Sequence, residues 1–398
     1  MLEILLHKKR LNLKMTVYIN AISGLTPFGN LEETWKGITD NKVCYGPITK
    51  FTPDRYTRST VAGEVTFNSE DYPIITDIER DKMPEHMQWT LGLTSELLGT
   101  TKLPKDRTSV IVSSGISTYL ESIRANESGM DNSYTFSPNL IANNINIKYG
   151  FTGPSLMSMT ACSSGLYSII MGCMLIETGQ ADHVIAGAVD QTIDANSYKQ
   201  LCKLRALSTK YNNEPETASR PWATSRDGFV LSEGGALFLL SNERTPDTLA
   251  EISGYGMTND AHAVVAPHPD GTEIERCMRL ALKNKVPDLI NAHATGTPMG
   301  DYLEIDAINR LGLSNTWITA NKSQLGHLMV GAGAIETAIS VLSLKHNIIT
   351  PSLNIGNLEE SYNIKYTPKT IDNHWVNSVL CNSFGFGGTN ASLLLSKT

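Results

Sequence analysis

Short apolar runs rich in β-branched residues recur along the chain, separated by polar stretches. Within each run the apolar residues are mostly consecutive instead of alternating with polar ones, which is typical of strands buried on both faces of a sheet. The pattern predicts strands over residues 16–23 (TVYINAIS), 109–115 (SVIVSSG), 183–190 (HVIAGAVD), 236–241 (ALFLLS), 288–294 (DLINAHA) and 378–384 (SVLCNSF).

Two further segments have a helical pattern. From Cys162 to Gly179 the apolar positions surround the helix on most faces, which predicts a buried helix with Gly179 as its C-terminal cap. A similar helix is expected from about Gly333 to His346. Strands that alternate with buried helices favour an α/β fold with helix layers around sheets. Because each half of the chain has one such helix just after a loop of small residues, the pattern also hints at an internal duplication.

The boundary between the two halves is expected near residue 245, where the polar stretch SNERTPDTL follows a predicted strand. We therefore expect an N-terminal extension (residues 1–14), a first unit (15–245) and a second unit (246–398). The chain has 398 residues, of which 41% are hydrophobic, and this is enough for a large core. Met15, directly before TVYINAISG, is a candidate start of the protein.

Charge and hydropathy exclude several classes of protein. The net charge is −7 and charged residues of both signs are scattered along the chain, so we expect no nucleic-acid partner. No stretch reaches the roughly eighteen consecutive apolar residues of a membrane span. The N-terminus, MLEILLHKKRLNLKM, has its apolar run before its basic cluster, which is the reverse of a signal peptide. We expect a cytoplasmic protein with no membrane partner.

One of the six cysteines has a distinctive setting. None of the six forms a CxxC pair or a zinc-ligand spacing, so we expect neither a metal site nor a disulfide framework. A lone cysteine is most often a small buried hydrophobe. Cys162, however, stands in SMTACSSGLYS, with small residues after it and then the predicted helix. The positive end of a helix favours a thiolate, and its free N–H groups can hold an oxyanion. Cys162 is thus either packing material or a nucleophile.

Three glycine-containing segments are further candidates. His293 stands in NAHATGTPMGD at the end of a predicted strand, and His327 stands in NKSQLGHLMVGAG before the second buried helix. Taken singly, each histidine is more often structural than catalytic. The segment NSFGFGGTNAS (382–392) lacks the lysine of a P-loop and does not open a helix, so it is not expected to hold a phosphate. A tight turn between two strands is its simplest interpretation.

Together and in this order, these segments resemble the β-ketoacyl-acyl-carrier-protein synthases, the condensing enzymes of fatty-acid and polyketide synthesis. The resemblance runs from residue 16 to 396 and is strongest to the ketosynthase II type with a Cys-His-His triad. It is carried by TACSSG, SRPWATSRDGFVLSEGGA, NAHATGTPMGD, NKSQLGHLMVGAGAIE and CNSFGFGGTNAS. It implies a thiolase-like, five-layered αβαβα sandwich of two pseudo-duplicated halves, usually dimeric. It also implies decarboxylative Claisen condensation of malonyl-carrier-protein with a cysteine-bound acyl chain. No cofactor is expected, because the substrates are carried on the phosphopantetheine of an acyl carrier protein.

The resemblance implies a role for each matching residue. Cys162 would accept the acyl chain, and His293 and His327 would donate hydrogen bonds to the malonyl thioester oxygen. Lys322 and Glu336 would organise the site electrostatically. The backbone N–H groups of Cys162 and Phe384 would hold the first oxyanion, and Phe384 with Gly385 and Phe386 would gate the entry of the acyl chain. Thr295 and Thr297 would bind the pantetheine arm, and Ile116 would border the acyl pocket. Lys82 and Arg205 would contact the carrier protein.

Some positions depart from the family pattern. Ala294 stands where glycine is usual, and Asp81 stands where a basic residue is common on the carrier-protein surface. One alternative is a thiolase or a ketosynthase III type enzyme, which would need a residue other than His327. Another alternative is a non-catalytic chain-length-factor subunit, which usually lacks the nucleophile. The sequence does not distinguish a homodimer from a heterodimer with a chain-length-factor-like subunit, and it does not identify the acyl chain.

Overall fold

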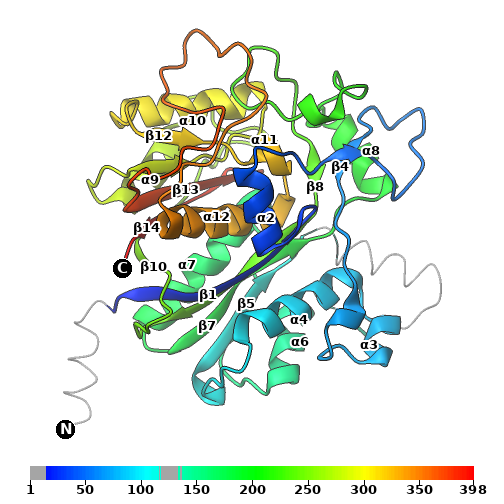
Figure 1. The fold of residues 1–398 in the computed structure, drawn as a ribbon, viewed down its shortest axis with the longest axis vertical. Coiled ribbons are helices and arrows are strands. Elements are labelled where there is room, and N and C mark those ends of the chain that lie inside the picture. Colours follow the sequence, from blue (N-terminus) through cyan, green and yellow to red (C-terminus); the bar gives the residue numbers. More distant parts are fainter. Residues whose placement is uncertain (1–14, 116, 118–132, 135–136) are drawn as a thin grey trace.

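The computed structural model describes residues 15–115, 117, 133–134 and 137–398 of the chain (Figure 1). Ile116 and the extension 1–14 lie outside these residues, so what the sequence led us to expect of them stays a prediction. Within the described part, most strands join one 11-stranded sheet in the order β12-β11-β13-β14-β10-β1-β9-β7-β5-β6, with β2 paired to β1. The bounds are β1 Val17–Thr26, β2 Gly29–Asn30, β5 Thr108–Ser113, β6 Ser155–Leu156, β7 His183–Asp190, β9 Gly234–Ser241, β10 Ala250–Asn259, β11 Leu289–Asn291, β12 Trp317–Thr319, β13 Ser378–Gly385 and β14 Thr389–Ser396.

The sheet consists of two copies of the same arrangement. From its outer edge inward, the first half has the order β6-β5-β7-β9-β1 and the second half has β12-β11-β13-β14-β10. In each half the three outer strands run parallel to one another. The fourth strand is antiparallel to the third, and the fifth is antiparallel to the fourth. The halves are joined where β1 pairs with β10 over only three residues, Val17 to Ile19. The internal duplication suspected from the sequence is therefore confirmed.

Helices form three layers around the two halves of the sheet (Figure 1). Helices α7 and α12 lie in the middle and contact strands of both halves. Helices α4 and α6 cover the outer face of the first half, and α9 packs on the outer face of the second half beside α10. This is the expected five-layered sandwich. The helix bounds are α2 Leu31–Thr39, α3 Asp77–Lys82, α4 Glu85–Leu98, α6 Leu140–Tyr149, α7 Ser164–Glu177, α8 Ala195–Lys203, α9 Thr272–Leu282, α10 Pro298–Arg310, α11 Lys322–Leu325 and α12 Ala332–His346.

The sequence pattern explains which face each helix buries. Helix α9 buries Ile274, Cys277, Met278, Ala281 and Leu282, a spacing that places all five on one side of the helix. Helix α7 is buried at ten of its fourteen positions, as expected for a helix between two sheets. It ends at Glu177, and its C-terminal cap is Thr178, one residue before the predicted cap Gly179. Gly179 follows with a φ of 72°.

The two central helices approach each other closely at their N-terminal ends. A Cβ atom on Gly165 of α7 would lie 2.6 Å from the backbone nitrogen of Ala334 in α12. A Cβ atom on Gly333 of α12 would lie 2.5 Å from Leu166 of α7. Real Cβ atoms do not approach so closely, and at Gly165 the neighbour is backbone that cannot move aside, so this position requires glycine. At Gly333 the neighbour is the end of the Leu166 side chain, which a larger residue would force to move. The close approach brings the residues just before the two helices, including Cys162 and His327, into one region.

Three short strands form a separate sheet in the order β3-β4-β8, with bounds β3 Gly46–Pro47, β4 Val61–Gly63 and β8 Leu231–Ser232. Strand β8 leads directly into β9, and a bridge joins Leu231 to His327. This small sheet therefore supports the loop that carries His327. None of the helices in the described ranges combines the length and the apolar character that crossing a membrane requires.

Candidate active site

Cys162 lies in a tight turn at the start of α7. The turn is a 3-10 helix, Ala161–Ser163, and Ala161 has a φ of 51°, in the left-handed region that most residues avoid. The hydroxyl of Ser164 stabilises the turn, since it donates to the carbonyl oxygen of Ala161 (2.7 Å) and accepts from the N–H of Thr160 (2.8 Å). The Cys162 side chain is only 5% exposed. The sulfur is thus fixed at the buried N-terminal end of a central helix.

The hairpin formed by β13 and β14 holds this turn from the other side. The hydroxyl of Ser383 donates to the carbonyl oxygen of Cys162 (2.9 Å), and the hydroxyl of Thr389 donates to that of Thr160 (2.9 Å). A Cβ atom on Gly385 would lie 2.6 Å from the Thr160 carbonyl oxygen and 3.2 Å from the backbone nitrogen of Cys162. The glycine-rich segment is therefore a tight turn between two strands, as its simplest interpretation predicted, and it also packs against the cysteine.

His327 faces the cysteine from the loop before α12. Its N–H donates to the carbonyl oxygen of Val230 (2.7 Å), and its carbonyl oxygen accepts from the N–H of Ser232 (3.0 Å). The edge of its ring packs on Phe229, with ring centroids 4.9 Å apart. These contacts fix the imidazole so that its Nε2 atom lies 3.0 Å from the sulfur of Cys162.

His293 is positioned by a buried carboxylate that the sequence reasoning missed. Glu304 of α10 accepts hydrogen bonds from the N–H groups of His293 (2.9 Å) and Ala294 (2.8 Å), and from the side chain of Asn382 (3.1 Å). These bonds hold Ala294 at a φ of 32°, a conformation that suits the glycine usual in the family. The signal that could have found Glu304 is its place as an acidic residue among Leu303, Ile305 and Ile308, in a helix that the sequence pattern did not predict.

Asp301, one turn earlier on α10, was also missed. It is fully buried and accepts hydrogen bonds from the N–H groups of Trp222 (2.8 Å) and Gly296 (3.0 Å). Burial raises the pKa of Asp301 to about 7. Because Trp222 belongs to the SRPWATSRDG segment and Gly296 to the NAHATGTPMGD segment, this carboxyl group joins the two segments in the structure.

The three candidate catalytic side chains meet in one pocket. The Cys162 sulfur and the ring nitrogens of His293 and His327 all lie within 4.8 Å of one another, and the two imidazole rings are nearly perpendicular, with centroids 5.5 Å apart. The pocket has a volume of about 320 Å³. Of the residues that the sequence singled out, it is lined by Cys162, His293, Thr295, Thr297, His327, Phe384, Gly385 and Phe386.

Burial determines the protonation of these groups. We expected the helix end to favour a thiolate at Cys162, but burial raises the pKa of its thiol to about 11, although the charge of Lys322 acts in the opposite direction. The resting sulfur therefore keeps its proton at neutral pH. Burial and the charge of Lys322 hold the pKa values of His293 and His327 well below the usual range, so both imidazoles are neutral.

Lys322 and Glu336 form a buried ion pair next to the histidines. Their side chains are each 2% exposed, and Lys322 Nζ lies 2.5 Å from Glu336 Oε1. Burial raises the pKa of Glu336 to about 7, and the charge of Lys322 opposes this rise. The positive charge that depresses the pKa values of both histidines would also repel a cation. We therefore interpret the cluster of one thiol and two imidazoles as a nucleophile with its partners and not as a metal centre.

The two phenylalanines of the hairpin have different positions from those expected. The backbone N–H that points at the sulfur of Cys162 is that of Phe386, not that of Phe384. Phe384 lies within β13, where it is paired with Asn390, and its ring packs edge-on against His293, with centroids 5.8 Å apart. Phe386 lies in the turn beyond the last residue of β13, where its N–H is free to face the site. We therefore expect the N–H of Phe386, instead of that of Phe384, to hold the first oxyanion.

The two residues expected to contact a carrier protein lie in different parts of the fold. Arg205 follows α8, and its neighbours Leu204 and Ala206 line the catalytic pocket. Lys82 is the last residue of α3, near α4 and α6 (Figure 1). The geometry does not bring these two side chains together within this chain.

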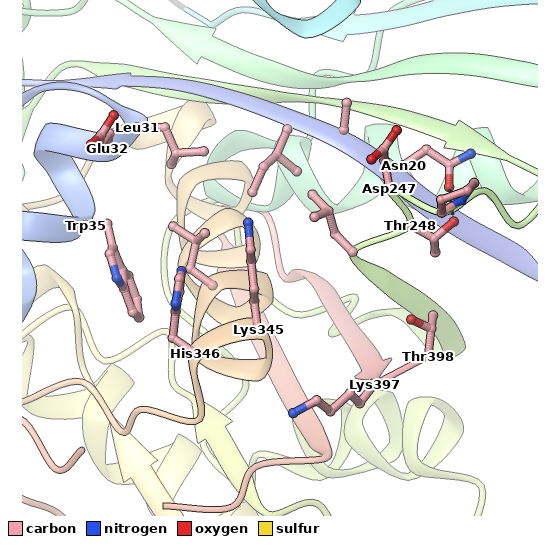
Figure 2. A pocket seen from close by; sticks show the side chains of 15 residues that line it. Asn20, Leu31, Glu32, Trp35, Asp247, Thr248, Lys345, His346, Lys397 and Thr398 are labelled. Carbon is pink, nitrogen blue, oxygen red and sulfur yellow. Dashed lines mark hydrogen bonds between the residues drawn. The ribbon is translucent and has the colours of Figure 1, made fainter. Parts of the chain in front are cut away.

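A larger groove lies elsewhere on the molecule (Figure 2). It has a volume of about 950 Å³ and is bordered by β1, α2, the end of α12, the loop before β10 and the C-terminus. Inside it the rings of Trp35 and His346 stack with centroids 5.5 Å apart. None of the residues that the sequence singled out lines this groove, so we place the candidate active site in the smaller pocket.

Replacing Glu304 by glutamine tests its role as a positioning residue for His293. An amide offers N–H groups where the backbone needs an acceptor, so we expect the free energy of unfolding to fall by about 1–3 kcal/mol. A displaced imidazole is expected to slow the decarboxylation step that the family resemblance implies by up to about 100-fold, while the acylation of Cys162 that it also implies stays nearly unchanged. Rates of CO2 release and of acyl-enzyme formation would be compared. Asp306→Asn, on the same helix but paired with Arg310, is the matched control; an equal loss in both half-reactions would contradict this role.

A duplicated α/β fold with a buried cysteine facing two neutral imidazoles defines a class of enzyme that transfers acyl groups through a cysteine thioester. The chain belongs to the β-ketoacyl synthase family. Residues 14–245 match the family model for "Beta-ketoacyl synthase, N-terminal domain", and residues 249–356 match that for the C-terminal domain.

Relatives and solved structures agree with this membership. The 3-oxoacyl-[acyl-carrier-protein] synthase 2 of Coxiella burnetii is 31% identical, over 96% of this chain and 99% of the relative. A β-ketoacyl synthase from Burkholderia phymatum has the same fold, with a TM-score of 0.85 and 22% identity, over 96% of this chain and 100% of that one. The same fold occurs in a structure of a type II polyketide acyl-carrier protein in complex with its ketosynthase. The matching chain there has a TM-score of 0.84 and 22% identity, over 97% of this chain and 100% of that one.

Proposed function

We propose that this chain is a β-ketoacyl-[acyl-carrier-protein] synthase, an acyltransferase that joins a cysteine-bound acyl chain to a malonyl unit with loss of CO2. The observation that carries the proposal is the meeting of the Cys162 sulfur with the ring nitrogens of His293 and His327, all within 4.8 Å in one pocket. A non-catalytic chain-length-factor subunit is not favoured, because the nucleophile and both histidines are present and face one another.

The first half-reaction transfers the acyl chain to Cys162. Because the thiol is protonated at rest, it must lose a proton as the sulfur attacks, and His327 Nε2, 3.0 Å away, is placed to accept it. The new bond joins the sulfur to the acyl carbonyl carbon. The carbonyl oxygen becomes an oxyanion that the N–H groups of Cys162 and Phe386 stabilise. The carrier thiolate then leaves and takes the proton from His327.

The second half-reaction extends the chain. The bond between the malonyl carboxylate and its neighbouring carbon breaks, CO2 leaves, and the electron pair forms a thioester enolate. His293 and His327 stabilise the enolate oxygen by donating hydrogen bonds from neutral rings. For His327 Nε2 to donate here, after it has acted as an acceptor in the first half-reaction, the ring proton must move from Nδ1 to Nε2 between the two half-reactions. The enolate carbon attacks the acyl carbonyl carbon, and the Cys162 sulfur leaves and regains a proton. One proton is consumed and one CO2 is released in each cycle.

The remaining pocket residues fit the substrate arm. Thr295 and Thr297 line the pocket, and their hydroxyl oxygens lie 3.0 Å apart. We assign them to hydrogen bonds with the amide groups of the pantetheine arm. Phe384 and Phe386 border the same pocket and are assigned to control the entry of the acyl chain. Burial, together with the charge of Lys322, keeps the histidines neutral between cycles, and Glu336 holds Lys322 in place.

Labelling tests the proposed function directly. The protein would be treated with a thiol-directed ketosynthase inhibitor, digested and mapped by mass spectrometry. We expect one modified peptide, containing Cys162. The five other cysteines provide internal controls, since four of them are buried outside the pocket and Cys44 is partly buried. Modification at another cysteine with Cys162 left free would contradict the proposal. Acyl chains loaded on Cys162 from a mixed pool of acyl carrier proteins would then identify the substrate.

A further inference from the structure

One buried carboxylate close to the site takes no part in either half-reaction. Asp190 is the last residue of β7, and its side chain is 1% exposed. Burial raises the pKa of Asp190 to about 6, while hydrogen bonds from Ser117, Val330 and Gly115 act in the opposite direction. At neutral pH the carboxylate is therefore mostly charged, and hydrogen-bond donors hold it in place.

The carboxylate of Asp190 joins two segments that are far apart in the sequence. Its Oδ1 atom accepts hydrogen bonds from the N–H of Gly115 (3.3 Å) and from the hydroxyl of Ser117, both of which follow β5. Its Oδ2 atom accepts from the N–H of Val330 (3.3 Å), in the turn that follows His327. Strands β5 and β7 are neighbours in the sheet (Figure 1). One side chain thus fastens the turn after His327 to the ends of these two strands.

The turn after His327 is tightly packed on both sides. A Cβ atom on Gly115 would lie 2.5 Å from a methyl carbon of Val330 and 2.7 Å from Asp190 Oδ2. A Cβ atom on Gly331, the last residue of the turn, would overlap the carbonyl oxygen of Gly234 at the start of β9. Because neither contact leaves free space, a change at Asp190 is transmitted to the turn instead of being absorbed.

The turn also contains a strained residue that borders the catalytic pocket. Met329 has a φ of 49°, in the left-handed region, and it lines the pocket. Such a conformation persists only where the surrounding contacts fix it. Strand β8 holds the backbone of His327 before Met329, and Asp190 holds Val330 after it. The 3.0 Å contact between His327 Nε2 and the Cys162 sulfur depends on this turn being fixed.

Asp190 also acts on Cys162 through its charge. This charge raises the pKa of the Cys162 thiol, in the same direction as burial and against the effect of Lys322. A thiol that keeps its proton reacts slowly with simple electrophiles. A substrate thioester is different, because His327 accepts the proton as the sulfur attacks. Loss of the charge should therefore speed the reaction with a simple electrophile, whereas a displaced His327 should slow the reaction with a thioester.

We propose that Asp190 is a positioning residue for acylation, which keeps the His327 imidazole within reach of the Cys162 sulfur by fastening the turn after the histidine to the ends of β5 and β7. The inference rests on the proposed function, because acylation of Cys162 is its first half-reaction. It gives a role to a residue of the HVIAGAVD segment, which the sequence pattern indicated only as a strand.

Replacing Asp190 by asparagine tests the proposal, since this removes the charge and one acceptor with little change in size. We expect acylation of Cys162 by the hexanoyl thioester of N-acetylcysteamine to slow by about tenfold or more. We expect alkylation of Cys162 by iodoacetamide at pH 8 to become about threefold faster, since a fall of half a pKa unit raises the thiolate fraction by that factor. A merely structural role would not change two reactions of one sulfur in opposite directions.

Two further variants separate charge, position and stability. Asp182→Asn is the matched control, because it removes an equal charge just before the other end of β7, where Asp182 pairs with Arg107 (2.9 Å). Both rates are expected to stay at the wild-type value. Asp190→Glu keeps the charge on a longer side chain, so we expect acylation to slow and alkylation to stay near the wild-type rate. Tm and peptide mapping of the alkylated protein would be measured for every variant.

The possible outcomes separate this proposal from the proposed function. Acylation at the wild-type rate in Asp190→Asn, or an equal loss in both reactions, would overturn the positioning role. Labelling of the other buried cysteines together with a large fall in Tm, in both Asp190 variants, would make Asp190 a residue of stability alone and would also overturn it. If the wild type is alkylated at Cys162 by iodoacetamide but is not acylated by the thioester, the proposed function itself is wrong.

Discussion

Replacing Cys162 by alanine is expected to lower the rate of condensation by about 10⁴-fold or more, because no other group can accept the acyl chain. The sulfur is held by backbone contacts of its turn, such as the bond from the Ser383 hydroxyl to the Cys162 carbonyl oxygen, and these do not need the thiol. We therefore expect Tm to change little. Intact-mass spectrometry should detect an acyl adduct on the wild type and none on the variant.

The matched control for this experiment is Cys173→Ala. Cys173 is fully buried in the same helix, α7, about three turns beyond Cys162 and outside the catalytic pocket. Its removal creates a small cavity and should cost stability without blocking turnover. Persistent condensation by the Cys162 variant would rule out covalent catalysis at this position.

Removal of either histidine is expected to have the second largest effect, and the two should differ. For His293→Ala we expect decarboxylation to slow by about 10²–10³-fold, the usual consequence of losing one donor to a developing oxyanion. Acylation of Cys162 should be nearly unaffected, because no hydrogen bond joins His293 to the sulfur in the described structure.

For His327→Ala we expect both half-reactions to slow. The donor role that the family resemblance implies for His327 would by itself give a loss mainly in decarboxylation. The contact of 3.0 Å between Nε2 and the sulfur adds a role in acylation, for which loss of a general base typically costs about 10²–10⁴-fold. Measurements of CO2 release and of acyl-enzyme formation on both variants distinguish these roles. If acylation proceeds at the wild-type rate in His327→Ala, the histidine is not the base for Cys162.

The features that the sequence predicted are those marked by local patterns. The six apolar runs became strands β1, β5, β7, β9, β11 and β13, although β11 ends at Asn291 instead of continuing to residue 294. Strand β10 was not predicted because its buried positions include Gly254, Gly256 and Thr258, which give no apolar signal. Motif context made Cys162, His293 and His327 candidates, and the family resemblance supplied their catalytic roles; the three line one pocket in the structure.

What the sequence could not supply depends on contacts between distant segments. Glu304 holds the backbone of His293 through hydrogen bonds, and nothing in its own surroundings along the chain indicates that partner. The choice between Phe384 and Phe386 as oxyanion donor depends on where β13 ends. The protonation of Cys162 depends on burial, which outweighs the helix end that the sequence reveals. Each of these requires the assembled structure.

The duplicated architecture divides the candidate catalytic residues between its two halves. Cys162 precedes the central helix of the first copy, and His327 precedes the equivalent helix of the second, whereas His293 also belongs to the second copy. The peptide that links the copies, between β9 and β10, is largely exposed at residues 243–247. A chain severed there would yield one fragment with the sulfur and another with both imidazoles. Turnover would then return only when the two fragments reassociate, because neither half contains the complete set of catalytic residues.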